Sequence, residues 1–224
     1  MAEDDLFAAD VAQDKPAGKP SKKGASKRPR GPRKVTEKSL ENVALHYLER
    51  FSTSAENLKR VLMRRVWRSA HHHGTDPEEG KAWAEAVVEK MVARGFVNDW
   101  LFAEGRVRTL LAQGTPLRGI RLKLREKGVA SDIIDEVLRL IEDDDGDVDF
   151  AAAVALAKRR RLGPFNLRGD REARREKDMA ALARAGFGVG VAARVIDAET
   201  ADDLEAMKYD GGSSGGLGYF PDEF

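Results

Sequence analysis

The sequence predicts an all-α protein, an elongated tandem array of three short three-helix units with a disordered basic N-terminal arm and an acidic, Gly-rich C-terminal tail. Apolar residues recur every three or four positions along the middle of the chain, as they do on one face of a helix. No useful length of sequence alternates with the two-residue period of a strand. Charged residues make up 34% of the chain, against about a quarter in ordinary proteins, which favours long solvated helices over a compact β-sandwich.

Composition separates the two ends of the chain from this helical core. Residues 15–34 hold nine basic residues, four prolines and no acid, so residues 1–35 are expected to form a disordered basic arm. Residues 211–216 contain only Gly and Ser, so residues 201–224 are expected to form a flexible acidic tail. No signal-peptide pattern opens the chain, and its longest apolar stretch, 150–157, is too short to span a bilayer. We therefore expect a cytoplasmic protein with no membrane partner.

The first unit is predicted over residues 36–96 and begins with two helices. Apolar residues from Leu40 to Phe51 fall at the spacing of one amphipathic helix, so both ends of this stripe are expected to face inward. Ser54 follows, and its hydroxyl is suited to cap the N-terminus of a second helix. Two consecutive helices joined by a short loop are therefore expected here.

The third helix of this unit has a clear start and a clear end. Asp76 is a good N-cap residue, and Pro77 suits the first helical position because its missing N–H is not needed there. Gly95 is expected to end the helix with a positive φ, which glycine tolerates best. Phe96 is expected to pack against the end of the same helix. This turn leads into the second unit.

The second unit, residues 97–146, repeats these signals. Asn98 or Asp99 is expected to cap its first helix, and Gly128 to end its second. Ser131 is expected to cap its third helix.

The third unit is predicted over residues 147–200. Asp170 can cap a long charged helix that ends at Gly186 and Phe187. A shift of 58 residues places Gly128 on Gly186 and aligns neighbouring apolar positions, which points to an internal repeat. Each unit is too small to bury its own apolar face well, so the three are expected to stack side by side.

No combination of residues indicates catalysis. The chain has no Cys, which excludes a Cys nucleophile and a Cys-ligated metal. His71, His72 and His73 are adjacent, so their side chains point apart and do not form a metal site. A phosphate-binding loop with its lysine is also missing. We therefore expect a protein that is not an enzyme and needs no cofactor or metal ion.

The remaining chemical signal is arginine gathered on particular helices of each unit. Arginine suits two-pronged recognition of phosphate or carboxylate, so these helices are expected to bind an anionic surface, either nucleic acid or an acidic protein groove. The candidate partner-binding residues are Arg64, Arg65, Arg68, Arg118, Arg121, Lys123, Arg125, Arg160, Arg161, Arg171, Arg174 and Arg175.

Several short motifs follow one another along the helical core. They are Tyr47-Leu48, Ser54-x-x-x-Leu58-x-x-x-Leu62, Gly95-Phe96-Val97-Asn98-Asp99-x-x-Phe102-Ala103, Gly114, Ile120, Leu124, Lys127-Gly128-Val129 and Gly186-Phe187. Taken in order, these motifs resemble the RecX family of recombinase regulators over about residues 39–198. The most specific of them is the turn at residues 95–103. The sequence departs from the family pattern at Ala55, where an acid or Arg commonly stands, and at Ala185, where Arg usually does.

The resemblance implies a tandem helical array that lies in the groove of a RecA-type recombinase filament on single-stranded DNA. Such proteins bridge neighbouring protomers, depress ATP hydrolysis and strand exchange, and limit filament extension during DNA repair and the SOS response. The family shares no catalytic site, and we expect a monomer. The residues of this sequence that match the family's turns, and are expected to be structural, are Gly95, Phe96, Asp99, Gly128, Gly186 and Phe187.

Two other functions fit the sequence. A direct DNA-binding or architectural protein would use the basic arm and the Arg-rich helices, and even a filament regulator could make a weak direct DNA contact. A scaffold would join other proteins through the two tails. DNA binding alone would depend steeply on salt and need no recombinase, whereas a filament regulator would act at amounts well below those of the recombinase.

Overall fold

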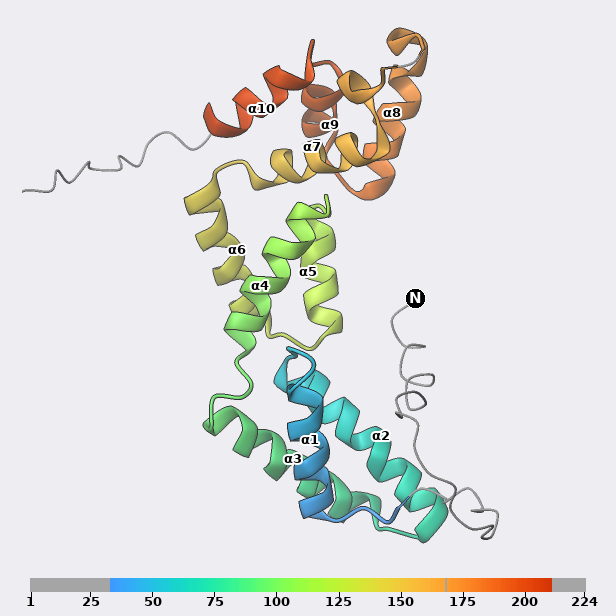
Figure 1. Cartoon of the computed structure of the whole chain (residues 1–224), viewed down its shortest axis with the longest axis vertical. Coiled ribbons are helices and arrows are strands. Elements are labelled where there is room, and N and C mark those ends of the chain that lie inside the picture. Colours follow the sequence, from blue (N-terminus) through green and yellow to red (C-terminus); the bar gives the residue numbers. More distant parts are fainter. Residues whose placement is uncertain (1–32, 168, 211–224) are drawn as a thin grey trace, which may run out of the picture. The chain divides into compact units, whose positions relative to one another are not determined.

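The computed structural model describes residues 33–167 and 169–210, and all the regular structure in this part of the chain is helical. Figure 1 shows the helices gathered in three groups that follow the chain. The helices are α1 (Glu37–Leu48), α2 (Ala55–His73) and α3 (Pro77–Ala93), then α4 (Asp99–Ala112), α5 (Leu117–Glu126) and α6 (Ser131–Asp145), and finally α7 (Val148–Arg160), the short 3₁₀ helix η2 (Gly163–Phe165), α8 (Arg171–Ala185), α9 (Val189–Ile196) and α10 (Ala201–Asp210). The predicted all-α class is confirmed.

Helices α1, α2 and α3 form the first bundle around a core of fully buried apolar side chains. Ser54 caps α2 by accepting a hydrogen bond from the Asn57 N–H at 3.2 Å, and Asp76 caps α3 with Pro77 at the first helical position. The core is built from residues on all three helices, the largest being Leu40, Leu58, Leu62 and Met91.

Two side chains at the margins of this bundle differ from the expectation. Phe51 lies beyond the end of α1 and is exposed, with its ring 5.1 Å from that of Tyr47, so the inward stripe stops before it. Val35 was expected to belong to the disordered arm, but its side chain is buried in this core and its N–H donates to the Ser69 hydroxyl at 3.0 Å. Burial of its apolar side chain therefore makes Val35 part of the first bundle. The rest of the predicted arm, residues 1–32, lies outside the described residues.

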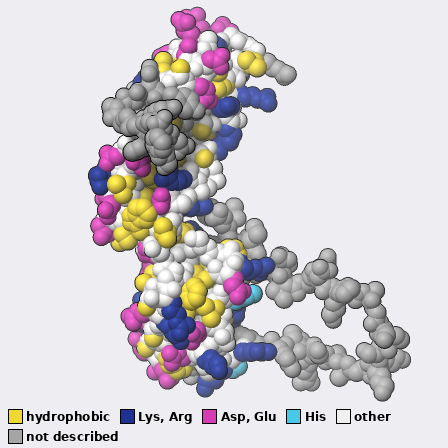
Figure 2. Space-filling view, turned by 60° about the vertical axis from the view of Figure 1, so that its left-hand side comes forward, with side chains coloured by type: hydrophobic (Ala, Val, Ile, Leu, Met, Phe, Trp, Pro, Cys, Tyr) yellow, Lys and Arg dark blue, Asp and Glu magenta, His cyan; other side chains and the backbone are white. Residues whose placement is uncertain are grey.

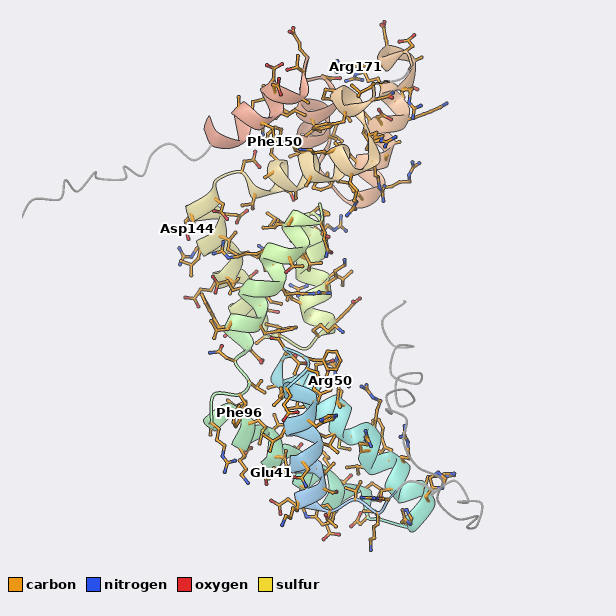
Figure 3. All side chains as sticks on the ribbon, in the orientation of Figure 1. Glu41, Arg50, Phe96, Asp144, Phe150 and Arg171 are labelled. Carbon is orange, nitrogen blue, oxygen red and sulfur yellow. The ribbon has the colours of Figure 1, made fainter. Side chains whose placement is uncertain are left out.

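The turn after α3 has the predicted backbone but not the predicted packing. Gly95 has a φ of 74°, and the Phe96 N–H donates to the Met91 carbonyl at 3.0 Å, which closes the helix end. The Phe96 side chain, however, is 55% exposed, whereas Val97 is 2% exposed. The apolar contact that secures the turn therefore comes from Val97, and Figure 3 labels Phe96 on this loop between α3 and α4.

Helices α4, α5 and α6 form the second bundle. Asn98 caps α4, because its side chain accepts from the Leu101 N–H at 3.0 Å. Ser131 was expected to cap α6 but already lies inside that helix, and Ala130 is the cap residue without any side-chain hydrogen bond. Val129 is buried directly after the preceding turn, and α6 begins two residues later, so the helix starts one residue earlier than predicted.

The third bundle contains α7, η2, α8, α9 and α10. Asp170 caps α8, Gly186 ends it with a φ of 104°, and Phe187 is buried behind it. Residues 201–210 were expected to start the flexible tail, but they form α10, whose Leu204 is fully buried against the third core. Apolar burial therefore extends the helical fold by one element, and the rest of the predicted tail lies outside the described residues.

Candidate surface for an anionic partner

The first and second bundles are joined at the N-terminus of α2. The Ser54 hydroxyl donates to the Lys127 carbonyl, and the first N–H of α2 donates to Asp99 Oδ1 at 2.8 Å. The Arg60 guanidinium donates to the Glu126 carbonyl at 2.6 Å. Carbonyls at the end of α5 are thus satisfied by α2, and a carboxylate from α4 satisfies an N–H at the start of α2. The N-terminus of α2 consequently lies against the C-terminus of α5.

The second and third bundles are joined in a similar way. Asp149 Oδ1 accepts from the Leu117 N–H, the first of α5, at 2.9 Å. The Arg159 guanidinium donates to the Gln113 carbonyl at the end of α4, also at 2.6 Å. In both junctions, an Asp at the start of one bundle's first helix caps the second helix of the bundle before it.

The second helices of the three bundles therefore follow one another end to end. The N-terminus of α2 meets the C-terminus of α5, and Pro116 at the start of α5 lies beside Gly186 at the end of α8. Partial positive charge at each helix start faces partial negative charge at the next helix end, so the helix dipoles favour this arrangement. We call α2, α5 and α8 the second-helix row.

Several predicted cations lie on this row without a partner inside the described part of the protein. They are exposed and make no ion pair or hydrogen bond with another side chain in residues 33–167 and 169–210. Figure 2 shows acidic and basic side chains interspersed over one face of the molecule, so charge alone does not distinguish a candidate surface. The predicted cations of the row that are free in this sense are Arg64, Arg65 and Arg68 on α2, Arg118, Lys123 and Arg125 on α5, and Arg174 on α8.

Other predicted cations make contacts within the protein. Arg121 on α5 forms an ion pair with Asp135 on α6. Arg175 donates two hydrogen bonds of 2.7 Å to the Asp197 carboxylate. These bonds lower the pKa of the Asp197 carboxyl, although partial burial opposes the shift. Arg171, labelled at the start of α8 in Figure 3, donates to three backbone carbonyls at the end of α9 and beyond, at 2.6 to 3.2 Å. These three residues hold helices together.

Arg160 and Arg161 occupy a third kind of position. They are exposed at the C-terminus of α7, which is not part of the second-helix row. Arg161 ends that helix with a φ of 57°, and its N–H donates to the carbonyls of the last turn.

The expected turn residues also take part in the junctions. Gly128 follows α5, and a Cβ at this position would overlap the side chain of Glu56 on α2. The role of Asp99 across the junction was not foreseen from the sequence. Asn98 and Asp99 are adjacent residues that both favour N-cap positions, and one helix start needs only one of them. Asn98 caps α4 and Asp99 caps α2, so the pair of adjacent capping residues is the sequence signal for the junction.

The charge of Asp149 gives the second junction a defined pH dependence. Burial raises the pKa of Asp149, the Leu117 N–H lowers it, and the nearby charge of Asp147 raises it, so the net shift is upward. Because the folded-state pKa of Asp149 is raised, protonation of this carboxyl stabilises the fold. This stabilisation is complete below the ordinary carboxyl pKa of about 3.9 and is lost as the pH rises through the raised pKa.

Asp149→Asn keeps the oxygen that accepts from Leu117 but removes the charge. We therefore expect its free energy of unfolding to match or exceed the parent's at neutral pH, with the difference growing as the pH rises from about 4 to 7. Asp149→Ala loses the cap and is expected to cost about 1 kcal/mol. Urea unfolding of the three proteins across this pH range measures both effects. An advantage of the Asn variant that shrinks with rising pH would contradict the assignment.

Neither a metal centre nor a membrane span is found in the described part of the chain. No three His, Asp or Glu side chains there are grouped so that they could hold a metal ion. His71, His72 and His73 are exposed at the end of α2. Within the same residues, every helix is too short or too polar to cross a bilayer.

Comparison with known proteins finds relatives along most of the chain. The family model for the second three-helix domain of RecX matches residues 98–138. The chain is 43% identical over 189 residues to the regulatory protein RecX of Myxococcus xanthus, which covers 84% of this chain and 100% of the relative. It is 30% identical over 165 residues to the regulatory protein RecX of Agrobacterium fabrum, which covers 73% of this chain and 85% of the relative.

Solved structures share the fold. The crystal structure of RecX from Lactobacillus salivarius superposes with a TM-score of 0.53 at 19% identity, covering 76% of this chain and 97% of the other. A second crystal structure of a regulatory protein RecX gives 0.50 at 22% identity, covering 72% of each chain. Identities this low support the fold alone. The two sequence relatives are more similar, at 43% and 30% identity, and the matches cover 100% and 85% of their lengths. This chain therefore belongs to the RecX family of regulatory proteins.

Proposed function

We propose that this protein binds in the groove of a RecA-type recombinase filament on single-stranded DNA, where it reduces ATP hydrolysis, strand exchange and filament extension during DNA repair and recombination. It acts in the cytoplasm as a monomer and contributes no catalytic centre or cofactor of its own. Membership of a family of regulatory proteins supports the proposal. The observation that carries it is the second-helix row, in which each of three bundles offers unpaired cations.

The repeated construction of the row suits a repeating partner. A recombinase filament presents the same protomer surface at regular intervals, and a protein with three successive bundles can contact more than one protomer at once. Weak contacts that act together raise the total affinity without any single deep pocket. The carboxylates of Asp99 and Asp149 hold successive bundles together, so cations on α2, α5 and α8 are available at the same time.

Free arginines on the row also suit an acidic groove chemically. Their guanidinium groups can form two-pronged hydrogen bonds with carboxylates, and unlike Arg121 or Arg175 they give up no internal ion pair on binding. Attraction between oppositely charged surfaces also speeds encounter, so binding is expected to weaken as salt rises.

A titration of the protein against recombinase filaments tests this function. We expect the rate of ATP hydrolysis on single-stranded DNA to fall at amounts of protein well below those of the recombinase, because one bound molecule affects the filament beyond its own site. An unchanged rate even at equimolar protein would refute the proposal. Inhibition that appears only when the protein approaches the amount of DNA, and that vanishes with added DNA, would favour the direct DNA-binding alternative.

A further inference from the structure

The outward side of α2 carries an aromatic side chain that the fold does not use. The helix buries Leu58, Leu62 and Val66 in the first core, and Trp67 lies on the opposite side with 58% of its surface exposed. Tryptophan combines a large apolar surface with a flat ring, and it is common where one molecule binds another.

Trp67 lines a hollow of about 420 Å³ on the surface of α2. The other lining residues are Glu56, Lys59, Arg60, Met63 and Arg64. The charges around this hollow are only partly used inside the protein.

Lys59 pairs with Glu85 on α3 at 2.7 Å, and the same hydrogen bond lowers the pKa of that carboxyl. Arg60 pairs with Glu56 at 3.2 Å and also binds the Glu126 carbonyl. Arg64 has no such partner among the described residues. The acids beside the hollow are therefore neutralised by their neighbours, while positive charge is left over.

Arg68 continues this positive charge along the helix. It follows Arg64 by four residues, so the two side chains lie on neighbouring parts of the helix surface about 6 Å apart along its axis. Like Arg64, it makes no ion pair within residues 33–167 and 169–210. The spacing is comparable to that of successive phosphates in an extended nucleic-acid strand.

We propose that this hollow binds single-stranded nucleic acid, with one base stacked on the Trp67 ring and the neighbouring phosphates bound by Arg64 and Arg68. An indole stacks on any base that is free of its partner, and guanidinium groups bind phosphate in a two-pronged manner. In a duplex, base faces are covered by their neighbours and cannot reach the ring. An acidic peptide could pair with the two arginines, but its carboxylates would leave the flat indole without a matching group.

This contact goes beyond the proposed function, because it requires no recombinase. It assigns Arg64 and Arg68 of the second-helix row to single-stranded DNA, whereas the cations of the row on α5 and α8 remain for the filament.

Binding to a fluorescently labelled oligothymidylate, followed by anisotropy with the full-length protein and no recombinase, tests the proposal. We expect Trp67→Ala to weaken binding about tenfold, which corresponds to about 1.4 kcal/mol. Trp67→Phe keeps a ring and is expected to restore most of the affinity. Arg64→Ala with Arg68→Ala is expected to reduce the salt dependence, lowering the slope of log affinity against log salt by about two.

Leu101→Ala is the matched control. Leu101 on α4 is another large apolar side chain, 60% exposed, and its removal is expected to change affinity less than twofold. A second measurement uses Trp67 as its own reporter in the Trp83→Phe and Trp100→Phe background. The single strand should quench its fluorescence and shield it from acrylamide.

Three results would overturn the proposal. One is equal affinity of the parent and Trp67→Ala for the single strand, since the basic residues of the arm would then account for all binding. Another is equal quenching by a duplex of the same length. The last is equal quenching by polyglutamate, which would assign the hollow to an acidic protein instead. Because no recombinase is present, each of these outcomes leaves the proposed effect on ATP hydrolysis to its own test.

Discussion

Replacing Gly114 by alanine is expected to destabilise the fold by about 3 kcal/mol or more. Losses of this size come from a few mechanisms, which include backbone strain and overpacking. Gly114 follows α4 with a φ of 72°, a conformation that costs other residues about 1–2 kcal/mol. An added Cβ would also lie 2.7 Å from the backbone nitrogen of Leu156 and 2.8 Å from its Cα. These atoms belong to α7, so they can move away only if the third bundle shifts against the second.

Gly95→Ala is the matched control for this effect. Gly95 has nearly the same φ, 74°, but an added Cβ there would meet nothing within 4 Å. We therefore expect a loss of about 1 kcal/mol, from backbone strain alone. Urea unfolding of both variants and the parent measures the difference. Equal losses would mean that the close approach of α7 to Gly114 contributes nothing to the junction.

Reversing two charges on α5 is expected to have the largest effect on function. Arg118→Glu with Arg125→Glu should raise the amount of protein needed to inhibit ATP hydrolysis by about tenfold or more, because attraction to an acidic groove is replaced by repulsion. Both arginines are exposed and unpaired within the described residues, so the free energy of unfolding should change by less than about 1 kcal/mol. Arg121 is left in place, since reversing it would set a new Glu beside Asp135.

The control for this variant makes the same change in net charge elsewhere. Lys38→Glu with Lys81→Glu alters α1 and α3 of the first bundle, which are not part of the second-helix row, and is expected to leave inhibition within twofold of the parent. Equal effects of the two pairs would mean that only net charge matters. If deletion of residues 1–32 abolishes inhibition while the α5 reversal leaves it intact, groove binding is wrong and direct DNA binding becomes the better account.

Helix ends were predictable where a cap lies within a few residues of the groups it satisfies. Ser54, Asp76 and Asp170 cap the helices that the sequence assigns to them, and Gly95 has its expected φ. Phe96 failed as an apolar contact because Val97, one position further, enters the core instead. Periodicity identifies an apolar face, but it does not decide which of two adjacent apolar residues is buried.

The sequence by itself determined the helical class, most helix ends and the basic character of α2, α5 and α8. These properties depend on residues three or four positions apart, so they can be read locally. Tertiary structure decided which cations remain free, because the groups that hold Arg171 and Arg175 lie 22 to 28 residues away along the chain.

The junctions likewise depend on contacts between distant residues. Asp149 caps a helix 32 residues before it, and Ser54 binds a carbonyl 73 residues after it. Contacts of this range form only when whole bundles pack. The sequence could therefore propose a set of arginines, but the packing of helices within each bundle determined which of them are held by internal contacts.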